Sequence, residues 1–152
     1  MADGSAAQVI VGVDGSETSL GAVQWAAGYA AATGAAISLV AAWVWPTSYG
    51  WPIPLPEEYN PASDAQRILA EVAAAVREKH PSLGVETIAV EGPAAKVLVD
   101  ASKDTALLAV GSRGHGQFAG MIIGSVSEHC VAHAHCPVLV YRHEGHEGQQ
   151  AG

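Results

Sequence analysis

The chain has 152 residues, of which 49% are apolar and only 14% are charged. This length suits one domain with a sizeable core, and the apolar fraction excludes a wholly disordered chain. The formal net charge of −8 argues against non-specific binding to nucleic acid or to an anionic membrane, because both need patches of Lys and Arg.

The distribution of charge and cysteine adds two expectations. Residues 1–66 contain no Lys or Arg, so an anionic ligand is expected to be bound mainly by residues after Arg67 or by backbone amides. Cys130 and Cys136 are too few for a disulfide framework, and the N-terminus lacks the basic region of a signal peptide. A cytoplasmic location is therefore expected.

The chain is predicted to open with a strand and a helix. Gln8–Val13 is a short apolar run that ends at the turn signal Asp14-Gly15, which is typical of a strand. Ser16 is suited to cap a helix that ends at Gly34. The predicted apolar stripe of this helix has residues three or four positions apart, namely Leu20, Val23, Ala27 and Ala30.

A buried strand and an irregular connection follow. Ile37–Val44 is continuously apolar, as a strand covered on both faces should be. The uncharged stretch between Glu17 and Glu57 is therefore interpreted as a buried helix and a buried strand, not as a membrane span. Trp45–Pro61 is rich in proline and is expected to be irregular. This segment is either a semi-rigid arm that covers a ligand or docks a partner, or a crossover stiffened by its prolines. Trp43 is assigned to the core of the preceding strand. For Trp45 and Trp51 the sequence does not decide between the two interpretations.

The second half of the chain continues the alternation. The predicted helices are Ala62–His80, Ala94–Ser102 and one that ends near Ala134, and the predicted strands are Val85–Val90, Ala106–Val110 and Val138–Tyr141. Five strands with four helical connections predict one doubly wound α/β domain, with a parallel sheet and helices on both faces. The domain is expected to span residues 8–142, between a flexible N-terminus, 1–7, and a flexible tail, 143–152.

Ligands of such sheets bind beyond the carboxyl ends of the strands, and two distinctive turns lie there. Asp14-Gly15-Ser16 follows the first strand, and the glycine-rich run from Gly111 through Gly114 to Gly116 follows the fourth. Farther along, Gly124-Ser125-Val126-Ser127 opens the last helix, where free N–H groups and hydroxyls favour an anion. The run lacks the Lys-Ser/Thr pair of a Walker loop, and a tight loop without a ligand is the alternative.

The same residues resemble the nucleotide-binding motif of the universal stress protein family. Gly111-x-x-Gly114, nine residues and then Gly124-Ser125 has the spacing of that motif, and Val11-Gly12-Val13-Asp14-Gly15-Ser16 is similar to the family's first strand and turn. The resemblance covers roughly residues 8–142, with actinobacterial members as the nearest type. It implies strand order 3-2-1-4-5, non-catalytic binding of ATP, with Mg²⁺ held through the phosphates, and a dimer formed through the last strand.

The resemblance also implies roles for individual residues. The backbone at Gly12 and near Ala42 would border the adenine, and Asp14 would contact the adenosine part, its alternative being a turn or capping residue. The phosphates would be held by the loop and by the start of the last helix, that is by Gly111, Gly114, Gly124, Ser125, Val126 and Ser127. Arg113 either adds charge there or faces solvent.

The resemblance places Val138–Tyr141 at a sheet edge, where unpaired backbone groups must be paired or covered. We expect it to pair antiparallel with a second copy near Leu139, so that Leu139→Pro removes ladder donors from both chains.

Other functions remain as alternatives. His129, Cys130, His133, His135 and Cys136 form a cluster with metal-capable side chains, and His129 and His133 share a helix face. No catalytic elbow or activated nucleophile is evident, so the protein is expected not to be an enzyme, beyond slow incidental ATP hydrolysis. The main expectation is an ATP-binding stress-response or signalling module with an unknown protein partner. The alternatives are a nucleotide-independent interaction protein, a slow ATPase and a cyclic AMP-binding protein.

Overall fold

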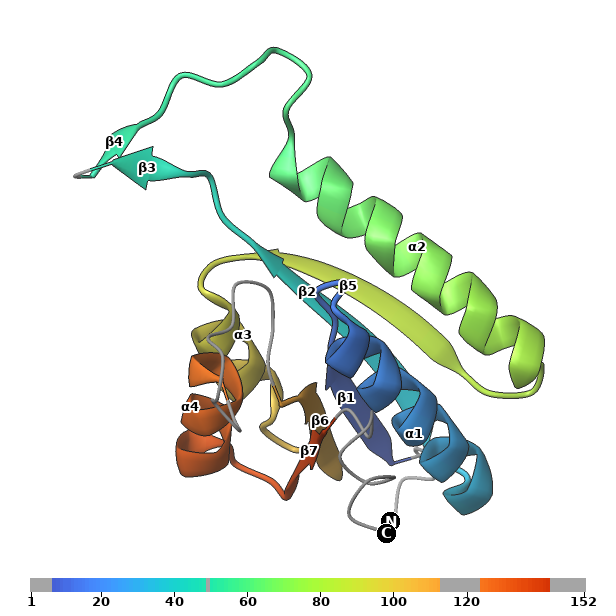
Figure 1. Ribbon diagram of the computed structural model, residues 1–152. Helices are drawn as coiled ribbons and strands as arrows, with labels where there is room; N and C mark the ends of the chain where they lie inside the picture. The colour runs from blue at the N-terminus through green and yellow to red at the C-terminus, as the bar shows by residue number, and fades with distance from the viewer. Residues whose placement is uncertain (1–6, 49, 113–123, 143–152) are drawn as a thin grey trace, which may run out of the picture.

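Five parallel strands form the central sheet of the computed structural model, which describes residues 7–48, 50–112 and 124–142 (Figure 1). The strands are β1 (Gln8–Gly12), β2 (Ala36–Trp43), β5 (Val85–Glu91), β6 (Leu107–Gly111) and β7 (Val138–Tyr141). Their spatial order is β5-β2-β1-β6-β7, which is 3-2-1-4-5 when these five strands are numbered along the chain. The predicted doubly wound fold is confirmed.

Two helices cover each face of the sheet. The helices are α1 (Glu17–Thr33), α2 (Pro61–Lys79), α3 (Ala94–Ala101) and α4 (Ser125–His133). Alternate residues of the strands point to opposite faces, so Val9 and Val11 pack with α1 and α2, whereas Ile10 packs with α3 and α4. None of the helices in the described part of the chain is long and apolar enough to cross a membrane.

The first helix keeps its predicted caps but not its whole predicted stripe. The Ser16 hydroxyl accepts a hydrogen bond from the Ser19 N–H, and Gly34 ends the helix with a φ of 77°. Val23 is buried as expected, but Leu20 is 38% exposed, so its assignment to the buried stripe is wrong. Half of the buried residues of this helix are alanines, namely Ala22, Ala26, Ala27 and Ala30.

The proline-rich connection contains a short hairpin that the sequence did not predict. Strands β3 (Thr47–Ser48) and β4 (Trp51–Pro52) pair antiparallel beyond the carboxyl end of β2 (Figure 1). Trp43 packs against the core, as predicted, while Trp45 contacts the rings of both Trp43 and Tyr59 edge-on. Trp51 is 75% exposed. The connection is therefore an arm whose base is fixed by aromatic contacts.

Strand β7 is an edge strand, and its backbone direction corrects one prediction. Pro137 O and Tyr141 O accept hydrogen bonds from the β6 side, from Leu108 N and Ser112 N. The direction of the backbone N–H and C=O groups alternates along a strand. In β7 these groups therefore point to β6 at odd-numbered residues and to the open edge at even-numbered residues. The prediction that the Leu139 N–H donates to a second copy is wrong, because the N–H of Leu139 points to β6. The N–H of Val140 points to the open edge.

Candidate functional site

The turn between β1 and α1 lies at the carboxyl end of the central strand. Gly15 has a φ of 83°, and the Asp14 carboxylate accepts a hydrogen bond of 2.9 Å from the Ser16 N–H. The Asp14 N–H in turn donates to the Ser19 hydroxyl, at 3.3 Å. The structure thus gives Asp14 the role of a turn residue, and its exposed side chain stands at the edge where a ligand would bind.

In the described part of the chain, no strand lies on the β1 side of the backbone groups at the end of β2. β1 ends at Gly12, which is in register with Val40, and the Val13 N–H donates to Val40 O at 2.8 Å. The backbone N–H and C=O groups of even-numbered residues of β2 therefore point to β1. Those of odd-numbered residues point to β5, as the hydrogen bond from the Gly92 N–H to Trp43 O shows. Ala42 consequently directs its N–H and C=O into the space beyond the end of β1. One donor beside one acceptor is the pattern that matches the edge of a purine base.

The protein's own packing requires glycine at residue 111 of the site and brings a flexible side chain close to Gly12. A Cβ on Gly111 would lie 2.7 Å from the backbone nitrogen of Ser19, in the first turn of α1. A Cβ on Gly12 would lie 2.8 Å from a methyl group of Leu98 on α3. Gly111 thus lets the first turn of α1 approach the end of β6 closely, whereas the contact at Gly12 is with the end of a side chain that can move.

The N-terminus of α4 faces the same end of the sheet. Gly124 holds the capping position without a side-chain cap, so the first-turn N–H groups, those of Ser125, Val126 and Ser127, carry the positive end of the helix dipole. Ser125 and Val126 are exposed, whereas the Ser127 hydroxyl is buried and donates to Ser112 O at 2.9 Å. Ser127 thus ties the two ends of the loop together; its predicted phosphate contact stays a prediction.

The structure therefore brings the ends of β1, β2 and β6 and the start of α4 to one edge of the sheet. The chain leaves β1 toward α1 on one face and leaves β6 toward α4 on the other, which makes the gap between them a topological switch point. Predicted site residues Arg113 and Gly114 lie outside the described residues. Among the described residues, the groups of this edge that suit an anion are backbone amides and the Ser125 hydroxyl.

The histidines and the cysteine of the predicted metal-capable cluster that lie on α4 differ in exposure. His129 and His133 lie side by side on α4, with ring centroids 4.4 Å apart. The two histidines are exposed, whereas Cys130 is fully buried and desolvation raises the pKa of its thiol to about 11. In the described ranges no three His, Cys, Asp or Glu side chains are grouped to hold a metal ion.

An aromatic stripe on α1 was missed by sequence reasoning. Gly21, Trp25 and Tyr29 are spaced four apart, the Trp25 and Tyr29 rings stack at 5.4 Å, and a Cβ on Gly21 would collide with the ring of Tyr141. The stripe therefore runs beside strand β7. The i, i+4 spacing of the aromatic residues was the available signal.

Comparisons with known proteins agree with this geometry. The sequence profile of the universal stress protein family matches residues 7–142. The universal stress protein Rv2624c of Mycobacterium tuberculosis is 36% identical over 135 residues, which is 88% of this chain and 47% of that protein. The chain thus spans about half the length of the curated relatives it matches.

Solved structures share the fold. A universal stress protein crystallised in complex with cAMP has a TM-score of 0.66 and 26% identity, covering 88% of this chain and 95% of the other. A family protein from Arabidopsis thaliana with AMP bound has a TM-score of 0.65 and 24% identity, covering 93% and 94%.

Proposed function

Because the chain belongs to the universal stress protein family, we propose that it binds ATP at the carboxyl end of its sheet and acts as a nucleotide-dependent module in a cytoplasmic stress response or signalling. The observation that carries the proposal is the direction of the Ala42 backbone, opposite the N-terminus of α4 across the end of β1. The Ala42 backbone suits the edge of adenine, and the N-terminus of α4 suits a phosphate chain. Mg²⁺ is expected to bind through the phosphates.

Cyclic AMP is the second candidate ligand. A solved relative at 26% identity is a complex with cAMP, and the Ala42 edge serves any adenine nucleotide. The output in either case is a bound state and not a product. Hydrolysis of ATP is expected to be a slow background, and a turnover near the ~10 s⁻¹ of a typical enzyme would contradict this.

The decisive experiment compares ligands on the purified full chain. Calorimetric titrations with ATP, ADP, AMP and cAMP, each with and without magnesium, rank the ligands, and mass spectrometry of the denatured protein identifies any nucleotide that co-purifies. Gly114→Val is expected to abolish ATP binding, because the motif assigns Gly114 to the phosphates. Gly28→Val is the matched control, since a Cβ at Gly28 meets nothing within 4 Å. Unchanged ATP affinity in Gly114→Val would contradict the assignment of the phosphates to this loop. A wild-type chain that binds and co-purifies no nucleotide would favour the nucleotide-independent interaction protein.

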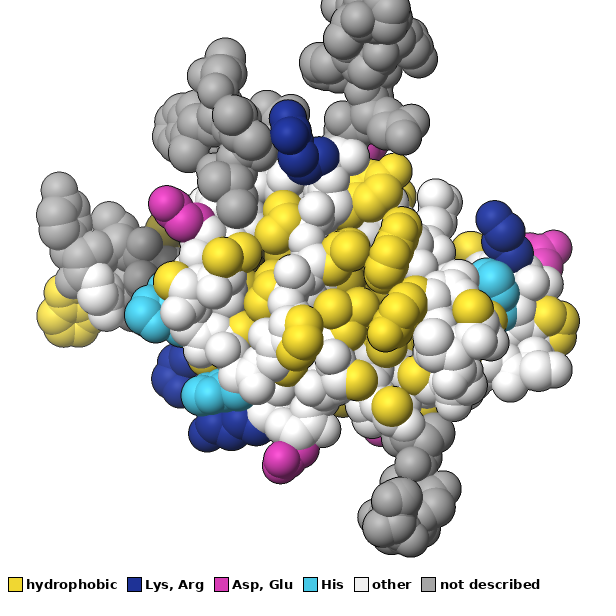
Figure 2. Space-filling model, turned by 90° about the horizontal axis from the view of Figure 1, so that it is seen from below, with side chains coloured by type: hydrophobic (Ala, Val, Ile, Leu, Met, Phe, Trp, Pro, Cys, Tyr) yellow, Lys and Arg dark blue, Asp and Glu magenta, His cyan; other side chains and the backbone are white. Residues whose placement is uncertain are grey.

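We further propose a homodimer through β7. This edge strand carries apolar side chains, and Val131 on α4, 55% exposed, and Trp25 on α1, 43% exposed, are large hydrophobic residues on the helices beside it. Figure 2 shows hydrophobic side chains gathered on the face that looks onto this edge of the sheet. An open ladder edge inside an apolar patch is suited to pair with its own copy about a two-fold axis.

A further inference from the structure

The opposite edge of the sheet carries an apolar groove. Strand β5 is covered by α2 on one face. Among the described residues, α3, with 8 residues, packs mainly on β2, β1 and α4 and leaves much of the other face of β5 uncovered. The groove between β5 and α3 has a volume of about 610 Å³, within the range of small-molecule sites.

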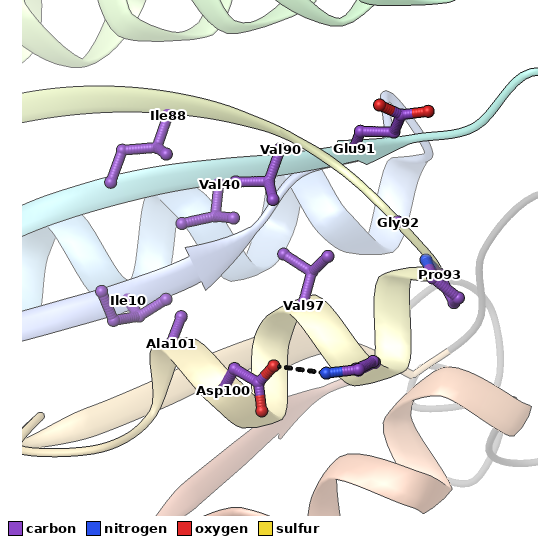
Figure 3. Close-up of a pocket in the computed structure, with 11 residues that line it drawn as sticks. Ile10, Val40, Ile88, Val90, Glu91, Gly92, Pro93, Val97, Asp100 and Ala101 are labelled. Atoms are coloured by element: carbon purple, nitrogen blue, oxygen red, sulfur yellow. Dashed lines mark hydrogen bonds and ion pairs between the residues drawn. The ribbon is translucent and has the colours of Figure 1, made fainter.

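Side chains from both walls point into this groove. Figure 3 shows Ile10, Val40 and Ile88 on the sheet facing Val97 and Ala101 on α3. Ile88 is 36% exposed although it is isoleucine in a strand. Because Ile10 and Val40 precede Gly12 and Ala42 by two residues, this part of the groove lies deeper along the strands than the proposed nucleotide site, whereas Gly92 and Pro93 line its end at the carboxyl edge of the sheet.

The charges at the rim compensate one another. Lys96 Nζ lies 2.9 Å from Asp100 Oδ2, and this hydrogen bond lowers the pKa of the Asp100 carboxyl. The side chain of Glu91 points away from the space between the apolar residues (Figure 3). Beyond Ile88 the same face of β5 carries Glu86, which accepts a hydrogen bond from the buried Ser38 hydroxyl. The cation that lines the groove, Lys96, is therefore already paired with a carboxylate.

We propose that this groove is a second small-molecule site, which binds an uncharged, largely apolar organic molecule. Its size and its apolar lining suit such a ligand, and Lys96, the cation of the lining, already pairs with Asp100. The site is independent of phosphate binding, so it stands even if the chain binds no nucleotide.

Two related fluorescent probes test the charge preference. N-phenylnaphthylamine is uncharged, and anilinonaphthalene sulfonate has the same aromatic body with a negative charge. The uncharged probe is expected to bind saturably, also in the presence of saturating ATP, and at least about tenfold more tightly than the sulfonate. Equal binding of the two probes, or displacement of the uncharged probe by ATP, would overturn the proposal.

Paired variants test the location. Ile88→Ser is expected to weaken the uncharged probe about tenfold, because it removes a wall of the groove. Ile53→Ser, which alters an isoleucine of similar exposure (38%) on the arm, is expected to leave it unchanged. Ala101→Phe fills the groove from α3 and serves if Ile88→Ser does not fold, as judged by circular dichroism. Probe binding that survives the filling variant, or that falls equally in Ile53→Ser, would contradict the assignment.

Discussion

Ala42 shows how much of the proposed recognition depends on a backbone direction and not on a side chain. Its N–H points beyond the end of β1, so Ala42→Pro removes a donor that the sheet does not use. We expect ATP and AMP to bind about tenfold more weakly, and equally so, because the lost contact is to the base. Calorimetry measures the affinities, thermal unfolding checks the fold, and Ala42→Gly, which keeps the N–H, is the control. A variant that loses only its preference for the triphosphate would move Ala42 away from the base.

The thiol of Cys130 shows how burial changes the ionisation of a single group. Desolvation raises the pKa of this thiol from 9.0 to about 11, so at pH 8 its thiolate fraction is about a hundredfold lower than that of an ordinary cysteine. Iodoacetamide is therefore expected to alkylate Cys136, which is half-buried, well before Cys130 in the native protein. Mass spectrometry of the digested protein reads out both sites. Because the folded pKa is the higher one, this thiol stabilises the fold fully below pH 9, and the contribution is lost as the pH rises toward 11.

At the scale of elements, the packing of α1 on β6 depends on a missing side chain. Gly111→Ala places a methyl group against Thr18 and Ser19 in the first turn of α1, and is expected to destabilise the fold by ~1–3 kcal/mol. Gly28→Ala makes the same change in open space inside the helix and is expected to stabilise by ~0.5–1 kcal/mol. Denaturant titration measures both variants. Equal stability of the two would mean that Gly111 does not hold α1 in place.

Element boundaries were predictable, whereas contacts between elements were not. The helix predicted over Ala62–His80 spans Pro61–Lys79, because its pattern is strongly amphipathic and Asn60 caps it. α1 is rich in alanine on all sides, so its periodicity did not reveal that Leu20 is exposed or that Gly21 meets Tyr141. Such contacts join residues far apart in the chain, and local pattern carries no information about them.

The candidate site likewise has some features that local sequence patterns predicted and others that they did not. The turn at Asp14 and the helix start at Gly124 follow from local turn and capping chemistry, and both lie where the sequence indicated. The buried hydrogen bond from Ser127 to Ser112 and the free edge at Ala42 depend on where neighbouring strands stop. Only the tertiary register determines those positions.

On the scale of the whole molecule, the two edges of the sheet differ in charge. Strand β5 carries Glu86 and Glu91, which discourage pairing with another strand, whereas β7 carries no charged residue. Of these two edges, β7 is therefore the one suited to join a second copy. The apolar groove beside β5 stays accessible in such a dimer.

The dimer is best tested by a proline at the outward-facing position of β7. Val140→Pro removes an N–H that points to the open edge and leaves the hydrogen bonds to β6 in place, so a folded monomer is expected. Leu139→Pro removes an N–H that points to β6 and is expected to destabilise the subunit itself. Sedimentation at tens of micromolar, combined with thermal unfolding, separates the two effects, and Val140→Ala, which keeps the donor, is expected to remain dimeric. A wild-type monomer would refute the dimer, and a dimer that survives Val140→Pro would place the interface on another surface.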